Sequence, residues 1–249
     1  MQKFKIKYLF LLIVICLSFN CHQWSEDYSI LESSPYVDYG TNNIPEIIDG
    51  PTGSAFGFGG NYIYTTTDTD TSIGVLGMNA LFRKRLGRIV EVGFTGTLMY
   101  KEKMFPYGVF DTRFQLSKQP ISISPDFGIG AGRGREKWSF DLRFSTIISY
   151  SIVKNRLNLY FVPKIIWFHY AYHAAGTEVG TSSVYYATSN IYGVGAGLCF
   201  TLLESTEQHG RTQKLRIKPE INYVMGQEPK LDQIDFSVLQ IGLQLLYAY

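Results

Sequence analysis

Apolar and polar residues alternate with a period of two along most of the chain from residue 54 onward. The segment WSFDLRFSTIISY, residues 138–150, is the clearest example, because aromatic and aliphatic residues take turns with Ser, Asp and Arg. This period places the two sets of side chains on opposite faces of a β-strand. The pattern predicts ten strands separated by turn-rich breaks. They cover residues 54–64, 73–82, 89–100, 107–116, 121–131, 138–150, 157–169, 190–202, 214–225 and 238–249.

Alternating segments of this length and number are typical of membrane β-barrels. We therefore predict an all-β fold, a transmembrane antiparallel up-and-down β-barrel of about ten strands, with eight strands as the alternative. The composition agrees with this prediction. Aromatic residues make up 15% of the chain, and charged residues only 18%, against about 25% in an average globular domain. Ring side chains favour the pleated surface of a sheet.

Alternation alone does not say which face points outward, because a soluble barrel also alternates. The polar face is rich in Gly and Ser, which suits the crowded interior of a small barrel. On the apolar face, Tyr and Trp gather near the strand ends, as in the aromatic girdles of barrels that cross a membrane. We therefore expect the apolar face to meet lipid. One girdle comprises Tyr62, Tyr64, Tyr100, Trp138 and Trp167, and the other Tyr150, Tyr247 and Tyr249.

The predicted inner face also carries charged residues of both signs. Five acidic and five basic residues share its parity, which suits an interior ion-pair network, since unpaired buried charge is costly. A lumen filled in this way predicts a structural or surface-interaction role, and a narrow channel for small polar solutes is the alternative. The network comprises Glu91, Asp111, Asp126, Asp141 and Glu220 with Arg113, Arg143, Lys164, Arg216 and Lys218.

The chain ends on VLQIGLQLLYAY, in which large apolar residues occupy every second position up to the last residue. This ending resembles the terminal β-signal of bacterial outer-membrane proteins, and the hairpins of residues 54–249 resemble small outer-membrane β-barrel proteins in general. The resemblance implies a bacterial outer-membrane location and recognition by the barrel-assembly machinery. The residues that carry the signal are Leu239, Ile241, Leu243, Leu245, Tyr247 and Tyr249.

The first 20 residues have the pattern of an export signal. Three lysines precede a short apolar run that ends at Phe19, and Cys21 follows. The segment resembles a bacterial lipoprotein signal, which implies that Cys21 is a lipid anchor; cleavage after Ser18 by an ordinary signal peptidase is the alternative. Residues 21–53 are polar, lack a sustained period and are predicted to be a linker before the barrel, residues 54–249. Without the three lysines, 20 basic and 21 acidic residues are left, which gives no support to nucleic-acid binding.

Three prolines fall inside predicted strands. Pro125, Pro163 and Pro219 lack the N–H that a strand ladder requires, and a closed barrel has no edge strand to accommodate them. We therefore expect local irregularity at each of the three positions.

The sequence offers little catalytic chemistry. His169 and His173 lie beside the longest predicted loop, residues 170–183, which contains Glu178. Positions four apart on a strand are roughly 13 Å apart, too far for one metal ion. We expect no catalytic residue, metal site or cofactor, and an outer-membrane hydrolase is the second alternative. The expected partners are outer-membrane lipids and the phosphates of lipopolysaccharide, which the arginine fork suits. The loop residues for that contact are Lys101, Lys103, Arg133, Arg135 and Lys137.

Overall fold

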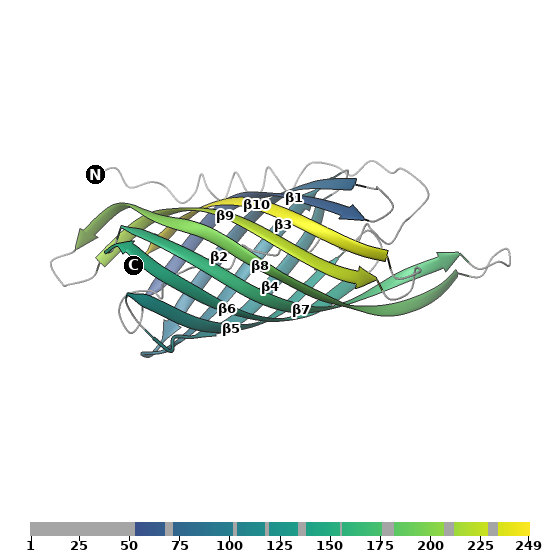
Figure 1. The fold of residues 1–249 in the computed structure, drawn as a ribbon, viewed down its shortest axis with the longest axis horizontal. Helices are drawn as coiled ribbons and strands as arrows, with labels where there is room; N and C mark the ends of the chain where they lie inside the picture. Colours follow the sequence, from purple (N-terminus) through teal and green to yellow (C-terminus); the bar gives the residue numbers. More distant parts are fainter. Residues whose placement is uncertain are drawn as a thin grey trace, which may run out of the picture.

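The chain forms one closed barrel of ten antiparallel strands in a computed structural model (Figure 1). The structure describes residues 53–67, 72–101, 104–117, 120–133, 138–154, 156–175, 182–206, 212–228 and 234–249. The strands are β1 (Ser54–Thr67), β2 (Ser72–Leu86), β3 (Val90–Tyr100), β4 (Met104–Phe114), β5 (Ile121–Arg133), β6 (Trp138–Val153), β7 (Leu157–Ala175), β8 (Ser182–Thr206), β9 (Thr212–Glu228) and β10 (Ile234–Ala248).

Each strand pairs with its neighbour in sequence, and β1 closes the barrel against β10. The amide of Ser54 donates to the carbonyl of Tyr249 at 2.8 Å, and the amide of Tyr249 donates back at 2.9 Å. The prediction of an all-β up-and-down barrel with ten strands is confirmed, and the alternative of eight strands is wrong. We call the end that holds Ser54 and Tyr249 the terminus end, and the opposite end the loop end.

The outer surface is apolar along every strand. Leu76 is 59% exposed, Ile129 58% and Leu243 53%, and large apolar residues alternate with buried ones in the same way around the whole barrel. A soluble barrel would bury this face, so its exposure agrees with a wall that meets hydrocarbon. In the part of the chain that the structure describes, there is no helix long and apolar enough to cross a membrane.

Strands β7 and β8 are much longer than predicted. Residues 170–183 were expected to form a long loop, but β7 continues to Ala175 and β8 begins at Ser182. Their pairing extends to Ala175 and Ser182, whereas β6 pairs with β7 only up to Tyr170 and β9 joins β8 only from Ile191. The tips of β7 and β8 therefore form a two-stranded ribbon that projects beyond the loop end (Figure 1).

Each of the three prolines interrupts the ladder on one side only. Pro163 pairs with Val194 of β8. On its other side, the pairing of β6 with β7 stops after Ser145 and resumes at Ile148. Pro125 pairs with β6, and the ladder to β4 ends beside it at Asp126. Pro219 pairs with β10, and the ladder to β8 is interrupted beside it. The missing N–H thus falls on the interrupted side, and the irregularity expected from the sequence is present.

Candidate functional site in the barrel interior

The interior contains an apolar layer at the loop end. On β4 and β7, for example, Phe105 and Phe168 point inward near the loop end and are at most 7% exposed. Side chains from eight strands join this layer. The alternating pattern does not predict this layer, because isolated inward apolar residues among polar ones do not change the period. The layer comprises Ile63, Val75, Met99, Phe105, Tyr107, Val109, Ile166, Phe168, Ile191, Val224, Phe236 and Val238.

A layer rich in buried charged residues, the charged layer, lies in the interior toward the terminus end. All ten charged residues of the predicted network lie here, buried, and three further basic residues join them: Arg83, Arg85 and Lys214. Eight basic residues therefore face five acidic ones, so the predicted balance of five against five does not hold. Arg83 and Arg85 were missed because the second segment was taken to end at Phe82, whereas β2 continues to Leu86.

Glycines in the intervening strands make room for the contacts in the charged layer. A cross-strand row contains Arg83, Gly93, Asp111, Gly128 and Arg143 on the successive strands β2 to β6. Arg83 reaches over Gly93 and binds the carboxylate of Asp111. A Cβ atom at Gly93 would lie 2.9 Å from Oδ2 of Asp111 and 3.0 Å from Cζ of Arg83, so a larger residue here would have to displace the bonded groups.

The same arrangement recurs between β4 and β6. The hydroxyl of Tyr107 donates to Asp141 across Gly130 of β5, and Arg143 donates to both Tyr107 and Asp141. A Cβ atom at Gly130 would lie 2.6 Å from Oδ1 of Asp141. The guanidinium of Arg143 also lies over the Tyr107 ring, 5.1 Å from its centroid. The contact joins the charged layer to the apolar layer, to which Tyr107 belongs.

A third cluster links β7 to β9 across the glycines of β8. The Tyr160 hydroxyl donates to Glu220 at 2.6 Å over Gly197, and Nζ of Lys218 lies 3.2 Å from the same carboxylate. Asn222 connects the cluster further, since it donates to Glu220 at 2.6 Å. Its own Oδ1 accepts a 2.6 Å hydrogen bond from Lys164.

Charges alternate in sign along a second cross-strand row. Arg85, Glu91, Arg113 and Asp126 stand opposite one another on the four successive strands β2 to β5. Opposite charges on directly facing residues attract, and like charges repel.

Beside Lys218 and Gln240 the charged layer leaves a cavity of about 10 Å³, which is the room of a single water molecule. At this point of the described interior the side chains thus pack closely around one small cavity.

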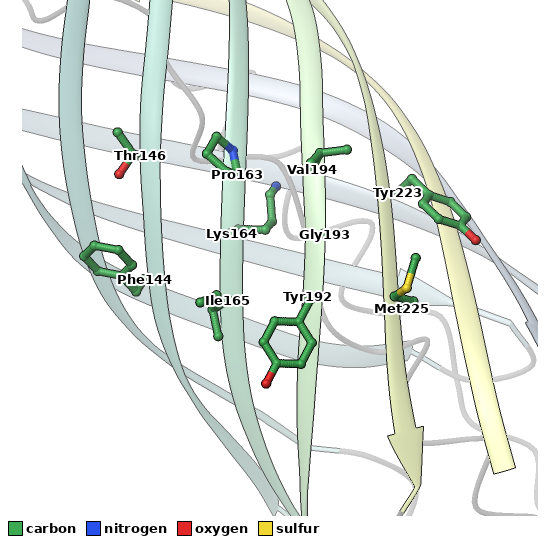
Figure 2. A pocket seen from close by; sticks show the side chains of 10 residues that line it. All are labelled: Phe144, Thr146, Pro163, Lys164, Ile165, Tyr192, Gly193, Val194, Tyr223 and Met225. Carbon is green, nitrogen blue, oxygen red and sulfur yellow. The ribbon is translucent and has the colours of Figure 1, made fainter. Parts of the chain in front are cut away.

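A groove of about 390 Å³ lies on the outer wall where Pro163 interrupts the ladder (Figure 2). Exposed apolar side chains on the four strands β6 to β9 line it, and Gly193 contributes only backbone. Lys164 is the one charged residue among those that line the groove, and its ammonium is bonded inside the barrel to Asn222. The lining suits a hydrocarbon chain. It includes Phe144, Ile165, Tyr192, Val194, Tyr223 and Met225.

The structure does not assemble the residues considered for catalysis. His169 is exposed on the outer wall, where Nδ1 lies 3.0 Å from the hydroxyl of Thr188. The side chain of His173, together with Glu178, lies outside the described residues. Among the described side chains, no three His, Cys, Asp or Glu residues are grouped so as to hold a metal ion. Cys199 is buried in the interior and forms no disulfide with a described residue.

The remaining predicted residues fall into three groups. The β-signal residues lie on the outer face of β10, with Tyr249 directly after it, and all but the half-buried Leu239 are exposed. At the loop end, Arg133 is exposed and Lys101 is half-buried. Outside the described residues lie Cys21, Lys103, Arg135, Lys137 and the side chain of Trp138.

No protein-family model matches the chain, and no curated protein does either. The solved structures that it resembles are bacterial outer-membrane β-barrel proteins. Neisserial surface protein A is 9% identical over 77% of this chain and 95% of its own, with a TM-score of 0.36. The attachment invasion locus protein Ail of Yersinia pestis is 16% identical over 80% of this chain and 100% of its own, with a TM-score of 0.34. The outer membrane protease OmpT from Escherichia coli is 7% identical over 82% of this chain and 98% of its own, with a TM-score of 0.46.

Proposed function

We propose that this chain is an outer-membrane β-barrel protein with a lumen closed by its own side chains, and that its role is structural or at the cell surface. The observation that carries the proposal is the pair of stacked layers: buried apolar side chains from eight strands gather at the loop end, and buried, bonded charged side chains lie toward the terminus end. The exposed apolar belt supports the membrane location. A water path would have to cross both layers.

Solute uptake into proteoliposomes tests this proposal against the alternative of a narrow channel for small polar solutes. Vesicles that contain the folded barrel are diluted into an isotonic solution of a small sugar or amino acid, and swelling is followed by light scattering. We expect the swelling rate of empty vesicles. Rapid swelling that depends on the amount of barrel would establish the channel. A heat-unfolded sample of the same protein serves as the control for vesicle damage.

The projecting ribbon supports a surface role. From Ala171 to Ala175, β7 pairs only with β8 among the described strands, and Ser182 to Asn190 of β8 pair only with β7. Both outer edges therefore present backbone donors and acceptors that an extended polypeptide could use. In the outer membrane these edges would stand clear of the barrel wall. We assign contact with other macromolecules to this ribbon.

The hydrolase alternative has one test. His169 is bonded to Thr188 and faces outward, so a His169→Ala variant should keep any activity that the purified barrel shows toward lipids or peptides. A loss of activity in that variant, with the barrel still folded, would favour the hydrolase.

A further inference from the structure

The groove at Pro163 makes the apolar outer wall hollow at one place. Its volume of about 390 Å³ lies within the range of roughly 300–1,000 Å³ that is usual for ligand pockets. Two cross-strand rows of outward side chains border it (Figure 2): Phe144, Ile165, Tyr192 and Met225 in one row, and Pro163 and Val194 in the other. A hydrocarbon chain that enters the groove would thus contact four strands at once.

Exposed apolar side chains continue from the groove toward the terminus end. On β6 and β7, Ile148 stands opposite Phe161, and Tyr150 stands opposite Leu159. All four side chains are 38% to 50% exposed. We call these two pairs the apolar lane. The lane joins the groove to the turn between β6 and β7 without a polar residue on the outer face.

The turn at the end of the lane is basic. Lys154 and Arg156 are both exposed there, and the amide of Arg156 closes the turn by donating to the Val153 carbonyl at 2.9 Å. Glu204, near the end of β8, is paired with Lys214 at 3.6 Å. An ammonium and a planar guanidinium side by side suit a phosphate group. The turn is therefore complementary in charge to an anionic headgroup.

The spacing of turn and groove matches one lipid molecule. From Arg156 to Pro163, β7 extends by roughly 23 Å, because a strand rises roughly 3.3 Å per residue. Half of a bilayer with its headgroups is roughly 20 Å thick, and the strands of a membrane barrel are tilted by roughly 40°. The groove therefore lies near the middle of the membrane when the turn lies at the level of the headgroups.

We infer that β6 and β7 bind one anionic diacyl phospholipid, with its phosphate at Lys154 and Arg156, one acyl chain along the apolar lane and the end of that chain in the groove. The inference rests on the proposed membrane location. A zwitterionic phospholipid is the weaker candidate, because its headgroup has no net charge for the two cations to attract. The basic residues expected to contact lipopolysaccharide, such as Arg133, belong to the loop end.

Fluorescence quenching by brominated lipids tests this site. Trp167 is the reporter, because it is 45% exposed and occupies the next outward position of β7 after Ile165 of the groove. Trp24→Phe with Trp138→Phe removes the other two tryptophans. The folded full chain is placed in phosphatidylcholine vesicles with increasing fractions of phosphatidylglycerol whose chains are brominated. We expect phosphatidylglycerol to bind roughly tenfold more tightly than brominated phosphatidylcholine, in line with two basic residues at the membrane surface.

Matched variants test the headgroup contact. Lys154→Gln with Arg156→Gln should abolish the preference for phosphatidylglycerol, because both cations of the turn are removed. Lys101→Gln with Arg133→Gln removes two cations at the loop end and should keep the preference.

A second pair of variants tests the groove. Val194→Phe places a ring in the groove and should weaken the binding of phosphatidylglycerol roughly fourfold, the effect of about one methylene group that loses its contact. Ile129→Phe adds a ring to the wall of β5, where Ile129 is 58% exposed, and should leave the binding unchanged.

Three results would overturn the inference while Trp167 is still quenched by lipid: equal binding of the two lipids, equal effects of the two charge variants, or unchanged binding in Val194→Phe. Stronger displacement of the brominated lipid by lipopolysaccharide than by unbrominated phosphatidylglycerol would also overturn it, because lipopolysaccharide would then be the preferred occupant. The absence of quenching by every brominated lipid would refute the membrane location, and the lipid site with it.

Discussion

The hydroxyl of Tyr107 on β4 donates a hydrogen bond to the carboxylate of Asp141 on β6, across Gly130 of the strand between them. Two further bridges in the charged layer cross a glycine in the same way: Arg83 to Asp111 over Gly93, and Tyr160 to Glu220 over Gly197. Because each bridge joins two strands that flank a third, the side chains tie the wall together on its inner face in addition to the backbone ladders.

Gly130→Ala should destabilise the barrel by about 1–3 kcal/mol, the usual cost of overpacking a filled site. The new methyl group would lie 2.6 Å from Oδ1 of Asp141 and would have to displace the bonded carboxylate. Gly60→Ala is the control, since its methyl group would have the Gly77 carbonyl oxygen at 3.6 Å as its nearest neighbour. Urea titration of the barrel in detergent measures both. Equal unfolding midpoints for the two variants would refute the requirement for glycine.

Tyr160→Phe should cost about 1.5–3 kcal/mol, because it removes a hydrogen bond to a charged acceptor. The Tyr160 hydroxyl is buried and donates to Glu220 at 2.6 Å. Tyr192→Phe is the matched control on the outer wall, where the ring is 51% exposed. The free energy of unfolding from the same titration is the readout. A loss as large for Tyr192 as for Tyr160 would show that the bridge does not stabilise the fold.

The two layers could be predicted only in part. The period of two assigns Asp111, Asp141 and Glu220 to the inner face without any knowledge of pairing. What it cannot supply is the cross-strand register, which alone places Gly93 between Arg83 and Asp111. Strand ends are the other weakness: alternation continues through Arg83 and Arg85, but basic residues at the edge of an apolar segment look like a turn. The ribbon was missed because Gly, Thr and Ser in residues 176–183 favour a loop.

Arg83→Met should be strongly destabilising, by about 3–5 kcal/mol, because it removes the cation bonded to the buried carboxylate of Asp111. Arg83 lies at 0% exposure and also has Glu91 at 3.6 Å. Adding Asp111→Leu to this variant should recover part of the loss, since an apolar pair of similar volume removes the unpaired charge. A double-mutant cycle by urea titration gives the coupling. Additive losses would mean that the two residues do not act as a pair.

Removal of the ribbon should leave the barrel intact. Residues 171–186 are replaced by Asn-Gly, a dipeptide that favours a two-residue hairpin turn, directly after the last pairing of β6 with β7 at Tyr170. The unfolding free energy should change by no more than about 0.5 kcal/mol, as for other changes away from the core. The mobility difference between boiled and unboiled samples on a gel checks that the barrel is folded. Loss of that difference would show that the ribbon stabilises the wall.

Single-channel recording in planar bilayers tests the closed lumen most directly. The folded wild-type barrel is inserted at increasing protein concentration, and insertion is verified independently by protection of the strands from protease. We predict no discrete current steps, because a water path between the two ends would have to cross both the apolar layer and the charged layer. Reproducible steps of uniform size that scale with the amount of inserted barrel would contradict a closed lumen and establish a channel in its place.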